Sequence, residues 1–503
     1  MNRILNSEVL CGHGNREGRR IMAELMDAGL TAADPYWKAK DLMHREGSLL
    51  TVGEPEFEPI GSPRTGPDTF DLDRDVNRVF IFGAGKGVWR AVQAYEEILG
   101  DYLSGGYVIL KHGDEGTSER ITITRGGHPV PDECCVKGCR EMVRYIRDAK
   151  LTARDLVITV AGNGVSSLLT LPPDEVTLED VRNITQVIQI ERGFPTPLLN
   201  IVRNQVDLLK GGRITRLLAP ARMIHTFTID INEGNDTYNL VGYRARTEVN
   251  EWLHTLPDIS TPEMAIDFLR KNDLWERMTP AVRDYLEHHA QEHPVMKLPE
   301  FEALDCRIYG LMAQSRSFVP AVTAKAKELG ISAHWMTKQY FAEAGAIGRL
   351  MCSIAKLIEE ENTPFQTPCV LIFTGEALVT VGENGGVGGR NQELALTAAA
   401  AISGRKNIVV GAADTDGTDG PGGYINADAE AKGVRVLGGG IVDGYTAQEA
   451  KERGVDIEDA LRTHATADAL WRLDSAVVST QNISINDLVL VLVTGNKPAE
   501  WRR

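Results

Sequence analysis

Short runs of β-branched and aromatic residues, each followed by glycine or aspartate, recur along the chain and constrain its fold most strongly. In the first half these runs are VNRVFIFGAG, GGYVILKHG, DLVITVAGNG and MIHTFTID. Stretches with helical spacing, such as ECCVKGCREMVRYIRDA, separate them. Strands that alternate with helices favour a parallel sheet with helices on both of its faces. The sequence therefore predicts an α/β fold.

The alternation is interrupted once, by charged helical pieces between residues 242 and 300. Beyond them it resumes with CRIYGLMAQ, ISAHWMTK, CVLIFTGE, NIVVGAAD and LVLVLVTG. A chain of 503 residues is too long for one ordinary core. We therefore expect two α/β domains with mainly parallel sheets, at residues 1–250 and 301–503, joined by an inter-domain helical region at 251–300.

The charge and the cysteine pattern exclude several classes of partner. A formal net charge of -16 would repel nucleic acid and anionic membrane surfaces, so we expect neither as a partner. No apolar stretch is long enough for a signal peptide or a membrane span, which predicts a cytoplasmic protein. The 7 cysteines lack paired CxxC spacing. We interpret them as reduced thiols, and the Cys134–Cys139 cluster as buried thiols in preference to a zinc site.

The segment VFIFGAGKGVWRAVQ is a candidate anion site at a strand-to-helix turn. Gly85 allows a sharp turn, and Lys86 stands at the start of a helix, whose N-terminus attracts anions. A P-loop is excluded because Gly87 follows the lysine where Ser or Thr is required. A dinucleotide fingerprint is excluded because Val88 replaces its third glycine. A purely structural turn remains the alternative.

Two further loops carry glycine followed by polar residues. In AGNGVSSL, the backbone at Asn163 and Gly164 and the hydroxyls of Ser166 and Ser167 could cradle a carboxylate or phosphate, although serines that cap a helix are the alternative. In the second loop, glycines at 382, 385, 386, 388 and 389 precede Arg390 and a helix. So much glycine indicates close approach to a ligand. Arg390 would bind an anion in fork geometry there, or else cover a solvated hairpin tip.

Carboxylates cluster after the run NIVVGAAD, at Asp414, Asp416 and Asp419. Acidic side chains at the carboxyl end of a strand suit Mg²⁺ that also binds nucleotide phosphates. An EF-hand is excluded because Ile425 stands where its closing glutamate would fall. A turn rich in Asp and Gly is the alternative. Cations for phosphates and an acidic loop for a metal are together what phosphoryl transfer requires.

Five motifs in this order resemble the glycerate 2-kinase family with its C-terminal MOFRL domain: GAGKG, GGHPVPDE, LLKGGRI, GGRNQELAL and DTDGTDGP. The resemblance extends over about residues 16–495. It implies a Rossmann-like N-terminal domain, a MOFRL-type domain at about 368–495, and conversion of D-glycerate to 2-phosphoglycerate with ATP and Mg²⁺. The family's invariant lysine and active-site arginine fall on Lys86 and Arg390. Its motifs add Lys210, Gly389, Asn391 and Glu393 to the binding candidates.

Other ligand loops depart from the family pattern. AGNGVSSL replaces its SGGGSAL loop, and IDINEGND replaces SDVxGDD while keeping Asp230, a third catalytic candidate. Beyond it, Tyr238, Tyr243, Arg244 and Arg246 add bulk and positive charge. These side chains favour a longer or doubly charged hydroxy acid as acceptor, unless they face solvent or a subunit partner.

Three functions therefore stay open. The first is a kinase that binds ATP and a small hydroxy acid. The second is an oxidoreductase of hydroxypyruvate, a name given to some members of the family, against which the missing dinucleotide fingerprint argues. The third is a catalytically inactive nucleotide-binding homologue, against which the retained Lys86, Arg390 and acidic loop argue. The acceptor, the catalytic base and assembly as a homodimer are not decided by the sequence.

Overall fold

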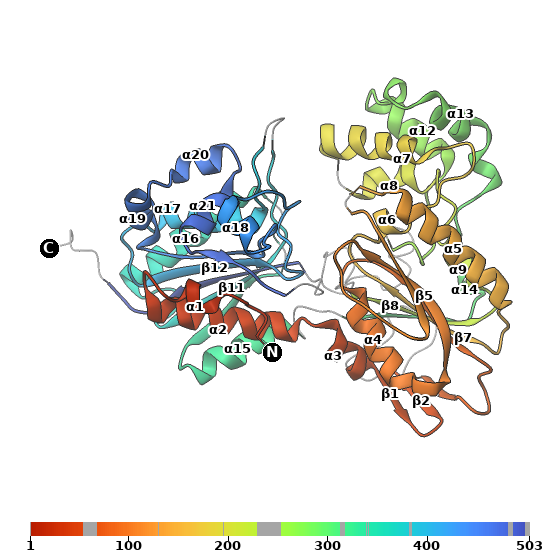
Figure 1. Cartoon of the computed structure of the whole chain (residues 1–503), viewed down its shortest axis with the longest axis horizontal. Helices are drawn as coiled ribbons and strands as arrows, with labels where there is room; N and C mark the ends of the chain where they lie inside the picture. The colour runs from red at the N-terminus through yellow and green to blue at the C-terminus, as the bar shows by residue number, and fades with distance from the viewer. Residues whose placement is uncertain are drawn as a thin grey trace. The chain divides into compact units, whose positions relative to one another are not determined.

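The chain divides into two compact units in a computed structural model, and each has its own sheet (Figure 1). One unit is Pro35–Leu311, and the other combines Met1–Asp34 with Met312–Arg503. The structure describes residues 2–53, 68–128, 130–194, 196–228, 253–311, 317–338, 340, 342–381, 385–480 and 486–497. Among the described helices, none combines the length and the hydropathy that crossing a bilayer requires.

A parallel sheet forms the centre of the 35–311 unit. Among the described residues, its strands lie in the order β6-β5-β4-β7-β8-β9. Its strands are β4 (Val79–Ala84), β5 (Leu103–Lys111), β6 (Ile121–Gly126), β7 (Leu156–Ala161), β8 (Arg222–Phe227) and β9 (Cys306–Gly310). Every residue of the central strands β4 and β7 is buried, as expected for strands that are covered on both faces. The predicted parallel α/β fold is confirmed for this unit.

Helices and a small second sheet complete this unit. The helix α4 packs against β4, β5 and β7, and α5 packs against β5 and β6. The elements are α3 (Pro35–Leu42), α4 (Val88–Leu99), α5 (Glu133–Ala149), α6 (Val165–Leu168), α9 (Arg213–Leu218) and α14 (Leu298–Glu302), with β1 (Met43–Glu46), β2 (Leu49–Val52) and β3 (Asp68–Asp71) in an antiparallel sheet.

The expected inter-domain region at 251–300 belongs instead to the 35–311 unit. Its helices α12 (Pro262–Lys271) and α13 (Pro280–His288) share a buried apolar cluster with α7 (Leu178–Thr185) and α8 (Thr196–Arg203). Each of α12 and α13 has a threonine N-cap followed by proline. The threonine side chain accepts a hydrogen bond from a backbone N–H of the first turn, and the proline ring fixes the backbone where the helix begins. Their charged residues are the solvent faces of amphipathic helices, which is why the sequence looked like a linker.

The sheet of the second unit is mixed, in the order β10-β11-β15-β12-β13-β14. Its strands are β10 (Ser332–Thr337), β11 (Cys369–Gly375), β12 (Ile408–Asp414), β13 (Gly439–Asp443), β14 (Ala476–Val477) and β15 (Asp487–Val493). The pair β10–β11 is parallel, whereas β15 lies antiparallel between β11 and β12. Flanking helices confirm the α/β class, but the expected parallel order fails here because β15 inserts between two earlier strands. A buried apolar run does not encode the direction of its neighbours.

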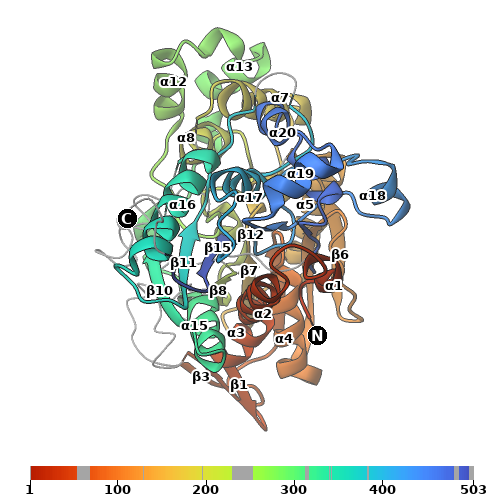
Figure 2. The ribbon, with the colours of Figure 1, turned by 90° about the vertical axis from the view of Figure 1, so that its left-hand side faces the viewer.

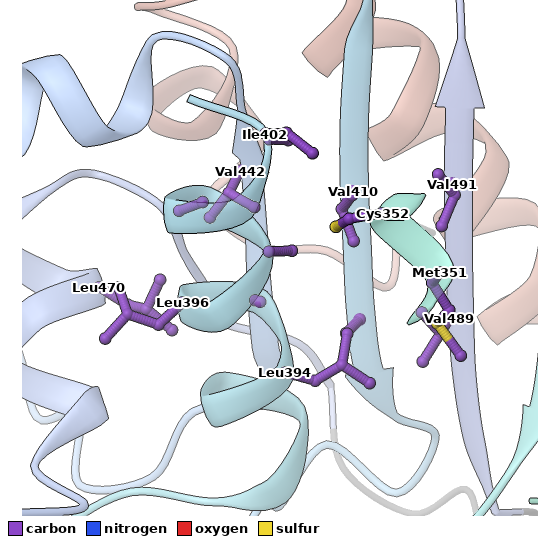
Figure 3. Packing of buried hydrophobic residues seen from close by; sticks show 14 of the residues in the cluster. Met351, Cys352, Leu394, Leu396, Ile402, Val410, Val442, Leu470, Val489 and Val491 are labelled. Carbon is purple, nitrogen blue, oxygen red and sulfur yellow. The ribbon is translucent and has the colours of Figure 1, made fainter. Parts of the chain in front are cut away.

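Helices cover both faces of this mixed sheet (Figures 1 and 2). The helices α16 (Ala344–Glu361) and α17 (Arg390–Ala401) pack together on one face. Figure 3 shows Leu394 of α17 and Met351 of α16 beside Val410 of β12 and Val489 of β15 in one apolar core. The remaining helices are α1 (Ser7–Leu10), α2 (Arg16–Ala32), α15 (Phe318–Glu328), α18 (Ala427–Ala431), α19 (Thr446–Arg453), α20 (Ile457–Arg462) and α21 (Thr466–Arg472).

The first 34 residues lie in the second unit, not in an N-terminal domain as expected. With α15, the helix α2 covers the sheet face opposite α16 and α17 (Figure 2). A Cβ on Gly411 of β12 would lie 2.5 Å from the sulfur of Met26, so the glycine allows α2 to lie against the strand. Arg19 is fully buried, and its Nε donates to Asp443 at 2.5 Å. Similarly, β9 belongs to the first sheet and not to the second domain, because it pairs with β8.

We predict that Asp443→Asn destabilises the protein strongly, because the buried Arg19 loses its counter-charge. The free energy of unfolding should fall by about 3–5 kcal/mol, as for other broken buried pairs. The matched control is Glu328→Gln, which breaks an exposed pair with Lys325 at 2.6 Å and should cost less than about 1 kcal/mol. Equal losses in chemical denaturation would contradict the structural role given to Arg19.

Candidate active site

Lys86 lies at the carboxyl end of β4, where the parallel sheet leads into α4. Gly85 has a φ of +145°, and a Cβ there would lie 2.7 Å from the backbone nitrogen of Gly162 in the β7 loop. The Lys86 N–H donates to the carbonyl of Asn163 at 2.7 Å. The two loops are therefore joined backbone to backbone, which a side chain at residue 85 would prevent. Open α/β sheets bind their ligands at this edge, and Lys86 is half-buried there.

The β7 loop brings His128 next to Lys86. Gly164 has a φ of +79°, and a Cβ there would lie 2.6 Å from the His128 ring and 3.2 Å from Cγ of Lys86. Asn163 and Gly164 are both half-buried at this point. Glycine at 164 thus leaves room for two functional side chains. His128 stands in the HPVPDE motif, but no sequence pattern shows that β6 and β7 would place it beside Lys86.

The two serines of α6 have different surroundings. Ser167 is buried, and its hydroxyl donates to the carbonyl of Gly127 at 2.8 Å. That bond joins two loops and removes Ser167 from the predicted ligand groups. Ser166 is half-buried, with its Oγ 2.8 Å from Nε2 of His254. His254 lies in the segment expected to join the domains, so the sequence carried no signal for it.

Lys210 is held by partners within its own unit, and its predicted binding role stays a prediction. Its side chain is buried, and Nζ donates to the carbonyl of Leu169 at 2.5 Å, to Oγ1 of Thr170 at 3.1 Å and to Asp207 at 2.6 Å. All three ammonium donors are used. The lysine therefore joins the chain after α6 to the turn before α9. The glycines that follow it in LLKGGRI have positive φ angles, which this tight turn requires.

Arg390 begins α17 in the second unit, and carboxylates surround it. Its Nε donates to the two oxygens of Asp487 at 3.0 and 2.8 Å, and its Nη2 donates to Asp414 at 2.9 Å. Glu376 lies 3.1 Å from the same nitrogen. Burial alone would lower the pKa of Arg390, but Asp487, Asp414 and Glu376 outweigh burial and hold the pKa well above its usual value. The guanidinium is thus permanently charged, and most of its charge is already balanced.

Asp419 caps the start of α17 through hydrogen bonds within its own unit. Its carboxylate accepts from the backbone N–H groups of Asn391 at 3.0 Å and Gln392 at 2.9 Å, and from the Asn391 amide at 3.1 Å. Gly389 leaves the space for this cap, since a Cβ there would lie 2.4 Å from Asp419. Burial raises the pKa of Asp419 to about 6, against the opposing effect of Arg390.

The acidic loop does not gather its three carboxylates into one group in the described part of the chain, and its predicted Mg²⁺ role stays a prediction. Asp414 accepts from Arg390, and Asp416 accepts from the backbone N–H of Thr418 at 2.8 Å and from its hydroxyl at 2.5 Å. The carboxylates turn toward different partners, and in the described part of the chain they do not converge as a group of three possible ligands. Internal hydrogen bonds brace this turn, which is rich in Asp and Gly.

Two other predicted binding residues also have partners within their own unit. The Asn391 side chain is part of the Asp419 cap. Glu393 pairs with Nδ1 of His464 at 2.7 Å. Both residues thus fix the start of α17. Asp230, the third catalytic candidate, and the residues from Asp236 to Arg246 lie outside the described residues.

One group of three possible metal ligands does occur among the described residues: His112, Asp132 and Cys134. Nε2 of His112 lies 2.7 Å from Asp132, which also caps α5 by accepting from the N–H of Cys135 at 3.0 Å. This hydrogen bond to His112 and those from backbone N–H groups outweigh the effect of burial and lower the pKa of Asp132 to about 2. These three residues lie in the segments that follow β5 and β6, at the same edge of the sheet as Lys86. Of the cysteines expected to be buried thiols, Cys135 and Cys139 are buried and Cys134 is exposed.

Comparisons with known proteins identify the family. A family model described as a domain of unknown function, DUF4147, matches residues 21–287, and the MOFRL family model matches residues 369–486. The chain is 31% identical to a D-glycerate 2-kinase of Thermotoga maritima over 83% of this chain and 91% of that protein. It is 28% identical to a glycerate 2-kinase of Pyrococcus horikoshii over 95% of this chain and 98% of that protein.

The chain belongs to the glycerate 2-kinase family. A crystal structure of glycerate kinase from Thermotoga maritima matches the fold with a TM-score of 0.71 and 27% identity, covering 94% of this chain and 99% of that one. The resemblance drawn from the five motifs is thereby confirmed. As a member of the glycerate 2-kinase family, the chain is a phosphotransferase with an alcohol group as acceptor.

We predict that Asp419→Ala destabilises the second unit without changing its response to Mg²⁺. Loss of the carboxylate leaves buried N–H donors unpaired, at a cost of about 1–3 kcal/mol. With no nucleotide present, Mg²⁺ should leave the Tm of both proteins unchanged, since a ligand that does not bind cannot stabilise. The matched control is Asp428→Ala on the exposed surface of α18, which should unfold like the wild type. A Mg²⁺-dependent rise in Tm that the Asp419 variant loses would restore the metal-site assignment.

Proposed function

We propose that this chain transfers the terminal phosphoryl group of ATP to the C2 hydroxyl of glycerate or a related small hydroxy acid. Glycerate would then give 2-phosphoglycerate and ADP. The observation that carries the proposal is the convergence of Lys86, His128 and Gly164 at the carboxyl edge of the parallel sheet. A glycerate 2-kinase relative that matches nearly the whole chain supports the choice of substrate.

In the proposed reaction, the acceptor's hydroxyl oxygen attacks the terminal phosphorus of ATP. The bond from that phosphorus to the oxygen shared with the next phosphate breaks, ADP leaves with that oxygen, and the hydroxyl proton passes to solvent water. Catalysis of this kind depends on positioning and on charge stabilisation. Lys86 would supply positive charge to the transferring group from a site that is already fixed by the β4 and β7 loops. The backbone at Asn163 and Gly164, with the Ser166 hydroxyl, lies on the same edge and would orient the reactants.

The carboxylates of the acidic loop do not converge as metal ligands in the described part of the chain. We propose that Mg²⁺ enters with ATP, bound to the nucleotide phosphates, as is usual for this ion. No step is assigned to a metal held by the protein. Arg390 keeps a phosphate-binding role in the proposal through Nη1, which has no hydrogen-bond partner in the described part of the chain. Its neighbouring carboxylates would keep that guanidinium charged throughout.

The oxidoreductase reading has less support. A dinucleotide fold places a third glycine on the first helix of the motif and an acid after the second strand, where it binds the ribose. Here Val88 is buried in α4, and the next strand, β5, leads into Lys111 and His112. The retained Lys86 and Arg390 argue in the same way against an inactive homologue.

We predict that Lys86→Ala lowers kcat by about two to three decades, because removal of one preorganised charge contact costs roughly 3–4 kcal/mol of transition-state stabilisation. Folding should be intact, since the side chain is only half-buried. The exposed Lys137 on α5 provides the control, as Lys137→Ala should leave kcat unchanged. Turnover of the Lys86 variant near the wild-type rate would remove this lysine from the mechanism.

We predict phosphorylation of D-glycerate with ATP, and a broadened choice of acceptor because of the rewritten loops. In a panel of D-glycerate, tartronate, erythronate and tartrate, at least one longer or doubly charged acid should come within about tenfold of D-glycerate in kcat/KM, a difference of about 1.4 kcal/mol. A larger preference for D-glycerate would restrict the enzyme to the plain family activity. Oxidation of NADH by hydroxypyruvate, with no phosphorylation of any acid, would favour the oxidoreductase and contradict the proposed function.

A further inference from the structure

Three cationic side chains are buried in one neighbourhood behind the Ser166 loop: Arg203 at the end of α8, and Lys210 and Arg213 around the start of α9. We call these three residues the buried cationic cluster. The backbone carbonyl of Lys210 accepts from Arg213 at 2.9 Å. The charge of Arg203 opposes protonation of Lys210, whose pKa is lowered chiefly by burial. Because the three side chains are buried, solvent screens the interactions among their charges only weakly.

Among the described residues, the cluster holds more positive charge than the carboxylate paired with it balances. In the described part of the chain, Asp207 is the carboxylate that pairs with it, through Lys210. Both oxygens of Asp207 are fully used, since they also accept from backbone N–H groups at 2.8 to 3.1 Å. Asp258 acts on Arg213 at longer range, but Lys297 lies against the same segment. Buried charge without a counter-charge is costly, so a surplus of this kind indicates a site for an anion.

Arg203 is the member of the cluster with hydrogen-bond donors to spare. Lys210 uses all three ammonium donors, and Arg213 donates to the carbonyls of Asn204 at 2.7 Å, Lys210 at 2.9 Å and His293 at 2.9 Å. Arg203, 5% exposed, directs Nε and Nη2 to a single oxygen of Asn200 at 3.1 and 3.0 Å. Its Nη1 has no hydrogen-bond partner among the described residues. One edge of a buried guanidinium is therefore free to bind a ligand.

The side chain of His254 contacts the Ser166 loop and is affected by the charges of the buried cationic cluster. Burial, together with the charges of Lys210, Arg203 and Arg213, holds the pKa of His254 well below its usual value. The imidazole stays neutral and adds no charge to the cluster, while its Nε2 lies 2.8 Å from the Ser166 hydroxyl. His254 thus positions Ser166, and the charge of Arg203 acts on the same imidazole.

We propose that Arg203 binds the carboxylate of the hydroxy-acid acceptor through its Nη edge, with the Ser166 hydroxyl beside it. A guanidinium edge matches the two oxygens of a carboxylate in geometry and in charge. The identity of the acceptor rests on the proposed function, whereas the anion site rests on the surplus charge and on the free donors of Arg203. A phosphoryl group carries the same chemistry, so the test includes ATP and inorganic phosphate.

The binding test compares wild type with Arg203→Gln by titration calorimetry. The Kd for D-glycerate should rise by roughly tenfold or more, as expected when a charge-assisted contact is lost, while the Kd for ATP and for inorganic phosphate stays unchanged. Equal D-glycerate affinities, or a larger loss for ATP or phosphate than for D-glycerate, would overturn the assignment to the acceptor carboxylate.

A stability test separates binding from a structural role. Arg203→Gln removes a buried positive charge and breaks only the two hydrogen bonds to Asn200. The midpoint of chemical unfolding without ligand should therefore stay the same or rise. Arg213→Gln is the matched variant, and it should lower the midpoint because it leaves buried carbonyls unpaired. A fall in the midpoint of Arg203→Gln as large as that of Arg213→Gln would make Arg203 structural and overturn the proposal.

The two proposals fail in different ways. If the wild type binds D-glycerate through Arg203 but transfers no phosphoryl group, the anion site stands and the kinase assignment fails. If the wild type phosphorylates D-glycerate and Arg203→Gln binds it equally well, the kinase assignment stands and the Arg203 proposal fails.

Discussion

The close approach of the β4 and β7 loops is the contact on which the candidate site depends. A Cβ on Gly85 would lie 2.7 Å from the backbone of Gly162, and one on Gly162 would lie 2.6 Å from Oγ1 of Thr228. These contacts fix the backbone on either side of Lys86 before any ligand arrives. Since neighbouring parallel strands end at one edge, the same contacts bring His128 to Lys86 from a different loop. The site is thus preorganised by backbone packing, which costs nothing at the moment of reaction.

Buried charge is balanced differently in the two units. In the 35–311 unit, Asp207 is the carboxylate that pairs with the buried cationic cluster among the described residues, through Lys210. In the other unit, one guanidinium lies among the carboxylates of Asp487, Asp414 and Glu376. Proteins bury charges when these are paired or needed for function.

The order of the chain explains why the domain boundaries were predicted incorrectly. The polypeptide begins in the mixed-sheet unit, leaves it at residue 34, builds the whole 35–311 unit and then returns. The bond from Arg19 to Asp443 closes a separation of 424 residues. Contacts of such long range are reached late in folding, because the intervening chain must first be ordered. The mixed-sheet unit is therefore incomplete without both ends of the chain.

The α/β class, the family and the place of Lys86 at the end of a strand could be read from the amino-acid sequence. The strands β4, β7, β12 and β15 coincide with apolar runs because strands covered on both faces need apolar residues at every position. The partners of the polar residues became known from the three-dimensional fold. Lys210 and Asp419 stand in glycine-rich motifs that look exposed, yet one is buried against Asp207 and the other caps α17. Periodicity is a local property of the chain, whereas the burial and pairing of a charge depend on neighbours that distant segments supply.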